Sequence, residues 1–174
     1  MQTEIAILIG AGLATVGWIY TARRARMLAR KQHTINVILQ TNFSERFLNS
    51  RSKIAPYLKK CECPDEIMNG ENEELRAHFR DILNHYEFVS AGMRNGDFDE
   101  RLLKDSEKST YIALYKCCEP YIWSLRNNRN RMSIYEHLEW VHSRWETNKP
   151  NKFVRAIERV RDKPFYGKLD QERK

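Results

Sequence analysis

The sequence has little glycine and proline, and this scarcity argues against a fold built from many tight turns. Seven glycines and five prolines occur in 174 residues, and only four of the glycines follow Gly17. No stretch of any length alternates apolar and polar residues as a half-buried strand does. Apolar residues recur three and four positions apart instead, which is typical of helices that bury one face. The sequence therefore predicts an all-α fold.

Most signatures of catalysis and of cofactor binding are also missing. There is no P-loop, no G-x-S-x-G and no pair of carboxylates that marks a cleft. The cysteines are Cys61, Cys63, Cys117 and Cys118. Their C-x-C and C-C spacings match no zinc-binding pattern. In HLEWVH, His137 and His142 stand five positions apart, whereas the H-E-x-x-H zinc motif needs four. We therefore expect neither a metal nor a cofactor.

The longest stretch without charge lies near the N-terminus, over residues 5–22. As a helix it would span roughly 27 Å, close to the roughly 30 Å of a bilayer core. Trp18 and Tyr20 stand where aromatic residues meet a membrane surface. Basic residues follow at once, namely Arg23, Arg24, Arg26, Arg30 and Lys31. Because positively charged flanks stay inside, we predict a transmembrane helix in a bacterial inner membrane, with residues 1–4 outside and the C-terminal domain cytoplasmic.

Two further predictions depend on that membrane helix. Gly10, Ala14 and Gly17 form a face of small residues, which lets two membrane helices approach closely and favours self-association. The five basic residues that follow the helix are expected to contact anionic lipid headgroups. They also account for part of the net charge of +7 without any nucleic acid.

The rest of the chain reads as a series of helices. Residues 23–58 are expected to continue the first helix as an amphipathic segment, because no glycine or proline interrupts it before Pro56. Residues 59–163 are expected to form a helical bundle and residues 164–174 a polar tail. Within the bundle, apolar spacing predicts helices over about 73–93, 109–126 and from 133 onward, and a last one after Pro150.

Local signals place the ends of these helices. Asp97 with Glu100, and Ser133 with Glu136, read as capping boxes at two helix starts. Gly92 or Gly96 is expected to supply the left-handed cap at the end of the helix over 73–93. Pro120 lies inside a predicted helix and is expected to kink it.

The segment RDILNH, residues 80–85, carries the strongest hint of chemistry. It matches the R-x4-H signature of the HEPN ribonucleases, in which histidine moves a proton and arginine stabilises phosphate charge. On an ideal helix, however, Arg80 and His85 point about 140° apart. Arg80 also shares a face with Asn84 and Glu87, at i, i+4 and i+7. These three form either a hydrogen-bonded ladder that fixes helix packing or a small polar site.

A basic turn, RNNRNRMS, joins two predicted helices. It contains Arg126, Arg129 and Arg131. Such a turn binds phosphate, of lipid or of RNA, or is simply a solvated loop.

The segments LNHYEFVSAGMRNGDFDERLL, residues 83–103, and YEHLEWVHSRW, residues 135–145, resemble a known family. The chain is similar there to the membrane-anchored bacterial and phage proteins known only as a domain of unknown function, DUF4760. The resemblance runs from the anchor to about residue 145, and it implies one N-terminal membrane helix followed by a cytoplasmic helical domain. It brings no established activity and no catalytic residues. A looser similarity is to phage abortive-infection proteins with the same plan.

Taken together, the sequence predicts a membrane-anchored helical module for interaction or sensing, with a protein partner or a second copy of itself. Phage defence or exclusion is the setting that the resemblance suggests. Two alternatives stay open: a tethered HEPN-like ribonuclease that uses Arg80 and His85, and a sensor of anionic lipid surfaces. Nucleic acid is expected as a partner only if the ribonuclease interpretation is correct. The first interpretation is an interaction or sensing module, which is not an enzyme.

Overall fold

A computed structural model describes residues 2–147, and the side chains of residues 10–146 within them. The described residues form six helices and no strand: α1 (Gln2–Phe43), α2 (Glu45–Lys60), α3 (Asp65–Asn69), α4 (Glu73–Asn95), α5 (Glu100–Arg129) and α6 (Glu136–Thr147). The predicted all-α fold is confirmed for this part of the chain. The helix expected after Pro150 and the tail over 164–174 lie outside the described residues.

The predicted transmembrane helix over residues 5–22 is wrong. In the described part of the chain, no helix is long and apolar enough to cross a membrane. A membrane-spanning helix needs about 20 predominantly apolar residues in succession, and the described part of α1 contains no such run. The predictions of a single-pass protein and of an inner-membrane location are wrong for the same reason.

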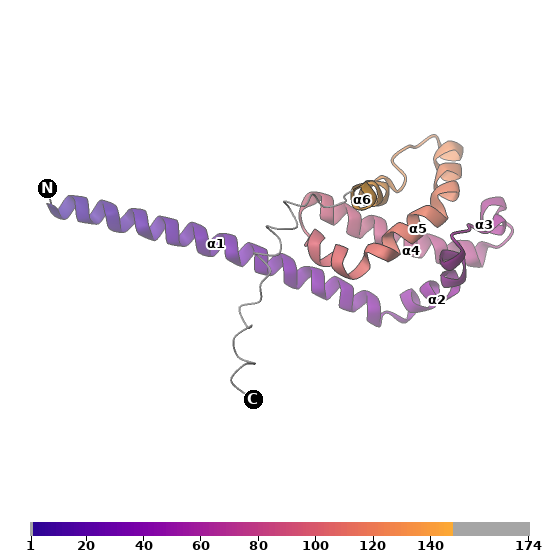
Figure 1. Ribbon diagram of the computed structural model, residues 1–174, viewed down its shortest axis with the longest axis horizontal. Coiled ribbons are helices and arrows are strands. Elements are labelled where there is room, and N and C mark those ends of the chain that lie inside the picture. The colour runs from indigo at the N-terminus through magenta and orange to yellow at the C-terminus, as the bar shows by residue number, and fades with distance from the viewer. Residues whose placement is uncertain (1, 148–174) are drawn as a thin grey trace, which may run out of the picture.

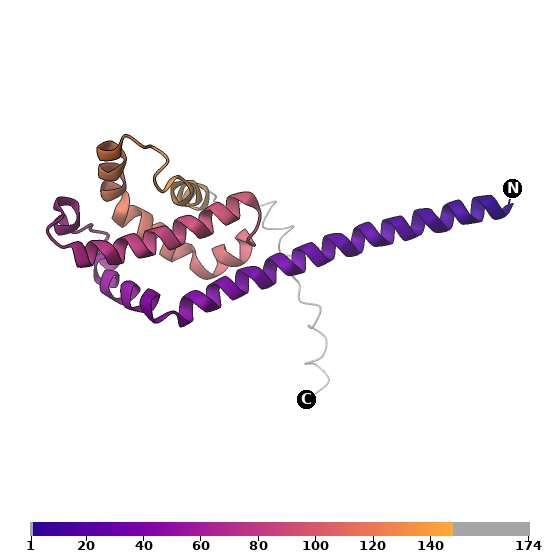
Figure 2. The ribbon, with the colours of Figure 1, turned by 180° about the vertical axis from the view of Figure 1, so that it is seen from behind.

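Helix α1 stands apart from the other described helices along most of its length. Figures 1 and 2 show α2 to α6 gathered into a bundle at one end, while α1 runs far beyond it toward the N-terminus. Only the C-terminal part of α1 touches the bundle, through Thr34, which is buried, and through Val37 and Ile38, which are half-buried. The fold is therefore a bundle with a long projecting arm.

The first helix does not continue to Pro56 as the sequence suggested. It ends at Phe43, and Ser44 then begins α2 by accepting a hydrogen bond from Phe47 N. Serine at this position satisfies a free amide of the new helix start, so the chain can change direction without losing helix hydrogen bonds. Pro56 lies inside α2, which ends only at Lys60. Residues 23–58 are thus divided between two helices.

Helix α4 is the central element of the bundle, and α2 and α6 pack against it. Its apolar face buries Phe79, Ile82 and Leu83, which belong to the same hydrophobic core as Tyr111 and Leu114 of α5. The indole of Trp145 on α6 is fully buried and meets the Tyr111 ring edge-on, with ring centroids 4.9 Å apart. Aromatic contacts of this kind add stability beyond the area that they bury. The core therefore joins the last three long helices.

Helix α5 is one continuous helix, where the sequence suggested a short helix followed by a longer one. Its N-cap is Asp99, which accepts from Leu102 N. Asp97 does not have this role, so the predicted capping box with Glu100 is wrong. Figures 1 and 2 show that α5 bends along its length, as expected of a helix with Pro120 inside it. Gly96, at φ +81°, supplies the left-handed cap of α4, as one of the two predicted glycines.

Candidate functional site

The projecting part of α1 carries several exposed large apolar side chains. Every side chain from Gly10 to His33 is exposed except that of Ala22, which is half-exposed. Leu13 is 70% exposed and Trp18 is 73% exposed. The other large apolar residues of the stretch 10–22 are Val16, Ile19 and Tyr20. Apolar patches of this kind on a folded protein mark contact surfaces.

The apolar residues of this arm follow a regular spacing. Gly10, Leu13, Gly17 and Tyr20 are separated by three, four and three positions, so they form one stripe along the helix. The stripe alternates a residue without a side chain and a bulky one. A Cβ built on Gly10 or on Gly17 would meet nothing within 4 Å. The glycines therefore leave open notches between the bulky side chains.

The arm is fixed to the bundle by contacts further along α1, at His33 and Thr34. The Thr34 hydroxyl accepts from Asp99 N at 2.8 Å and donates to Arg30 O at 2.9 Å. The ring of His33 stacks on Phe98, with centroids 5.0 Å apart. Phe98 in turn lies over Gly92, where an added Cβ would overlap the ring. These contacts set the direction in which the arm leaves the bundle.

A groove lies beside this junction, between α1 and the end of α4, with a volume of about 590 Å³. Arg26, Arg30 and His33, spaced i, i+4 and i+7, line its α1 side. Phe88, 65% exposed, and Phe98 form an aromatic wall on the other side. Among the described residues, neither the Arg26 guanidinium nor the Arg30 guanidinium has a hydrogen bond or an ion pair. The groove therefore combines an exposed aromatic ring with two free guanidinium groups.

Arg80 and His85, the predicted ribonuclease pair, do not meet. Arg80 Nη2 contacts Glu73 Oε1 at 3.1 Å on the exposed side of α4. His85 turns toward α1 and α2, where its Nε2 lies 3.3 Å from Thr41 Oγ1 and its ring meets Phe47. Burial lowers the pKa of His85, which favours the neutral imidazole. The two side chains thus have separate surroundings, and the ribonuclease interpretation stays a prediction without a common cleft to support it.

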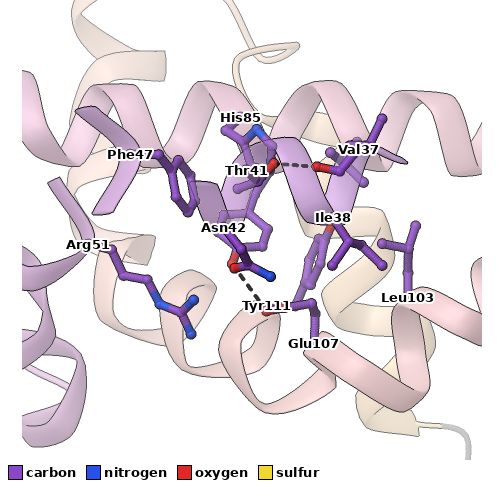
Figure 3. A pocket seen from close by; sticks show the side chains of 12 residues that line it. Val37, Ile38, Thr41, Asn42, Phe47, Arg51, His85, Leu103, Glu107 and Tyr111 are labelled. Atoms are coloured by element: carbon purple, nitrogen blue, oxygen red, sulfur yellow. Dashed lines mark hydrogen bonds between the residues drawn. The ribbon is translucent and has the colours of Figure 1, made fainter. Parts of the chain in front are cut away.

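His85 borders a small cavity where α1, α2, α4 and α5 converge. Figure 3 shows its side chain above Thr41, with Phe47 and Arg51 of α2 on one side and Glu107 and Tyr111 of α5 below. The cavity volume is about 20 Å³. That is enough for a water molecule and far too little for a drug-sized or nucleotide-sized ligand. We therefore do not place a substrate there.

Asn84 and Glu87 hold the start of α6 in place. Asn84 Oδ1 accepts from the Tyr135 hydroxyl at 3.1 Å. The Glu87 carboxylate accepts from His137 N at 3.2 Å and from Leu138 N at 2.8 Å, and it lies 2.8 Å from His137 Nδ1. It thereby satisfies amides that begin α6, a role that the sequence assigned to Ser133 and Glu136. The sequence left two interpretations of Arg80, Asn84 and Glu87, a ladder that fixes helix packing or a small polar site. The contacts of Asn84 and Glu87 favour the role in helix packing.

The end of α6 is held by a second carboxylate from a distant helix. Glu100 Oε1 accepts from Arg144 Nε at 2.6 Å and from Trp145 Nε1 at 3.1 Å. Burial raises the pKa of Glu100, but these two hydrogen bonds outweigh burial, so that the pKa lies below its usual value. Arg144 and Trp145, which lie in a segment that resembles the family, thus both hold α6 to Glu100 at the start of α5.

The basic turn is only partly available to a ligand. Arg126 is 3% exposed, donates from Nε to Ile134 O at 2.9 Å and pairs with Glu139 at 2.8 Å. Arg129 and Arg131 are exposed. A buried, paired guanidinium holds the turn together, so phosphate contact is left to Arg129 and Arg131. On α1, the basic residues predicted to contact lipid are exposed as well: Arg23, Arg24, Arg26, Arg30 and Lys31.

The cysteines form no metal site within the described residues. No group of three or more potential ligands that could hold a metal ion occurs there. Cys117 and Cys118 are buried, and Cys117 Sγ donates to Glu62 O at 3.4 Å. Burial raises the pKa of the Cys63 thiol to about 12, so this thiol stays protonated at neutral pH. The buried thiols therefore act as apolar packing groups.

Comparison with known proteins gives a family without an assigned role. A family model described as "Domain of unknown function (DUF4760)" matches residues 7–145, which is most of the chain. No curated protein and no solved structure matches the chain.

Proposed function

The chain belongs to the DUF4760 family, and we propose that it is a self-association module in which the α1 arms of two copies pair. The observation that carries this proposal is the exposed apolar surface of residues 10–22. An isolated helix gains little stability in water, since most helical stability in proteins comes from packing of an apolar face. The arm has no such packing against the other described residues, and a second arm supplies it.

The stripe on α1 favours one arrangement of two copies. If two arms run antiparallel and cross at residue 15, position 13 faces position 17 of the other copy, and position 10 faces position 20. Leu13 then fills the notch at Gly17, and Tyr20 fills the notch at Gly10. Large side chains opposite small ones are the condition for close helix packing. A parallel pair would instead set Leu13 against Leu13 and leave gaps at the glycines.

Charge favours the same arrangement. The basic residues of the arm begin at Arg23 and continue to Lys31. In a parallel pair these cationic segments would lie side by side and repel, whereas an antiparallel pair places them at opposite ends. Both size and charge thus favour the antiparallel dimer.

Substitution of the notch tests the proposal. We expect Gly17→Leu to weaken dimerisation of the full chain at least tenfold, because leucine fills the space that Leu13 of the other copy occupies. Leucine is about 1 kcal/mol better than glycine in a helix, so weaker pairing would not come from a weaker helix. The dimer dissociation constant is measured by sedimentation equilibrium in about 0.5 M NaCl, where charge contacts are screened.

The chain offers a matched control and a rescue. Gly12→Leu makes the same exchange outside the stripe, about 140° around α1 from Gly17, where a Cβ also meets nothing within 4 Å, and should leave dimerisation unchanged. Leu13→Gly alone should weaken pairing, whereas a mixture of Leu13→Gly and Gly17→Leu chains should restore it as a heterodimer. Equal effects of the two glycine substitutions, or a monomeric parent chain, would contradict the proposal.

A further inference from the structure

The bundle carries a surface that complements the groove beside α1, and it lies at the other end of the molecule. Between Lys60 and Arg76 all six charged residues are acidic: Glu62, Asp65, Glu66, Glu71, Glu73 and Glu74. This segment includes α3, whose Met68 side chain is 38% exposed. We name Met68 with Asp65 and Glu71, three positions to either side of it, the α3 knob.

The knob and the groove match in charge, and each contains an exposed apolar side chain. The knob has a flexible apolar side chain, and a carboxylate stands three positions before it and three positions after it in the sequence. Among the described residues, neither Asp65 nor Glu71 has a side-chain hydrogen bond or an ion pair. The groove has the exposed Phe88 ring beside the free guanidinium groups of Arg26 and Arg30. Methionine adapts its shape and makes favourable contacts with aromatic rings. Asp97 also lines the groove, but the two arginines leave an excess of positive charge.

The two surfaces cannot meet within one chain. Figures 1 and 2 show α3 at the end of the bundle that lies farthest from the projecting arm, whereas the groove lies where the arm leaves the bundle. A knob and a groove on opposite ends of one molecule form a head-to-tail contact between copies. Opposite charges around an apolar centre set the orientation and the rate of such a contact.

We propose that the groove between α1 and α4, lined by Arg26, Arg30 and Phe88, binds the α3 knob of a second copy. This contact goes beyond the pairing of α1 arms. It uses residues outside 10–20, and it is heterologous, so that each copy donates a knob to one neighbour and a groove to another. Arm pairing and knob binding together join dimers into longer assemblies.

The test alters the groove in one variant of the chain and the knob in another. A groove variant carries Arg26→Glu and Arg30→Glu, and a knob variant carries Asp65→Lys and Glu71→Lys. Both are full chains that also carry Gly17→Leu, so that arm pairing is removed. In about 50 mM NaCl, light scattering should show association of the Gly17→Leu parent that fades as salt rises. Each variant alone should associate at least tenfold more weakly than the parent.

Mixing the two variants gives the decisive result. The knob of the groove variant is intact, and so is the groove of the knob variant. An equimolar mixture should therefore associate again, because the intact knob of one chain meets the intact groove of the other. The two altered faces do not oppose this, since the altered knob is basic and the altered groove is acidic. A mixture that associates no better than either variant alone would overturn the proposal, as would a Gly17→Leu parent that stays monomeric at low salt.

A control pair guards against a general effect of charge. Arg23→Glu with Lys31→Glu makes the same change in charge on the same helix but outside the groove, and it should change association less than about threefold. An equal loss in this control would also overturn the proposal. Circular dichroism shows whether each variant keeps its helices. If Gly17→Leu does not weaken association at high salt, the proposed pairing of α1 arms is wrong. The mixture of the groove and knob variants still tests whether the groove binds the knob.

Discussion

Glu87 shows how one side chain can define the start of a helix fifty positions away. Its carboxylate accepts from the amides of His137 and Leu138 and approaches the ring of His137. Free amides at a helix start attract negative charge, both as hydrogen-bond donors and through the helix dipole. Glu87 thus does for α6 what a local capping residue usually does, and it joins α6 to α4.

We expect Glu87→Ala to lower the free energy of unfolding by about 2–3 kcal/mol, because half-buried amides lose a charged acceptor. Urea denaturation followed by circular dichroism measures the change. Glu119, an exposed glutamate on α5, provides the comparison, and Glu119→Ala should change stability by less than about 0.5 kcal/mol. Equal small effects of both substitutions would mean that Glu87 does not cap α6.

At the scale of residues, the sequence indicated which polar side chains share a helix face, but it did not indicate their hydrogen-bond partners on other helices. The ladder of Arg80, Asn84 and Glu87 was visible as a face of one helix. That Glu87 caps α6, and that Arg126 is buried against Glu139, depends on how distant helices pack. No local pattern contains that information. Gly96 is the exception, because a left-handed cap at the end of a helix is a local requirement that favours glycine.

At the scale of elements, α1 is the helix whose interpretation changed most. Its apolar start and basic continuation suggested a membrane helix, but its described residues are not apolar over a sufficient length. The break at Ser44 was also unexpected. Serine is common within predicted helices, and only the change of direction toward α2 shows that it acts as a cap here. The helices α4, α5 and α6 were recognised because their apolar stripes are long and regular.

The junction between α1 and α4 gives a prediction at this scale. We expect Gly92→Ala to destabilise the protein by about 1–3 kcal/mol, because the added methyl group overlaps the Phe98 ring and forces it away from His33. Alanine is the better helix former by about 1 kcal/mol, so a loss of stability would come from packing alone. Urea denaturation measures it.

The matched substitution is Gly12→Ala, which places the same methyl group on α1 where nothing lies within 4 Å. It should leave stability unchanged or raise it slightly. If Gly92→Ala behaved in the same way, the Phe98 ring would not be tightly held, and the direction of the arm would not be fixed by this contact.

For the molecule as a whole, the fold class and the family could be predicted from the sequence, and the arrangement could not. Apolar spacing indicated helices, and the segments around Tyr86 and Trp145 indicated DUF4760. The projecting arm and the position of the groove are results of packing between α1 and the α4–α5 turn. In our account, the bundle serves mainly to present two contact surfaces, the arm and the groove, at defined positions.

Amide hydrogen exchange of the full chain, followed peptide by peptide at about 1 µM and about 100 µM in high salt, tests the pairing of α1 most directly. Amides of residues 10–22 should exchange more slowly at the higher concentration, because pairing protects the arm. The Gly17→Leu chain should show no such change. Fast exchange over residues 10–22 at both concentrations would contradict the account, since the arm would then be an unpartnered helix.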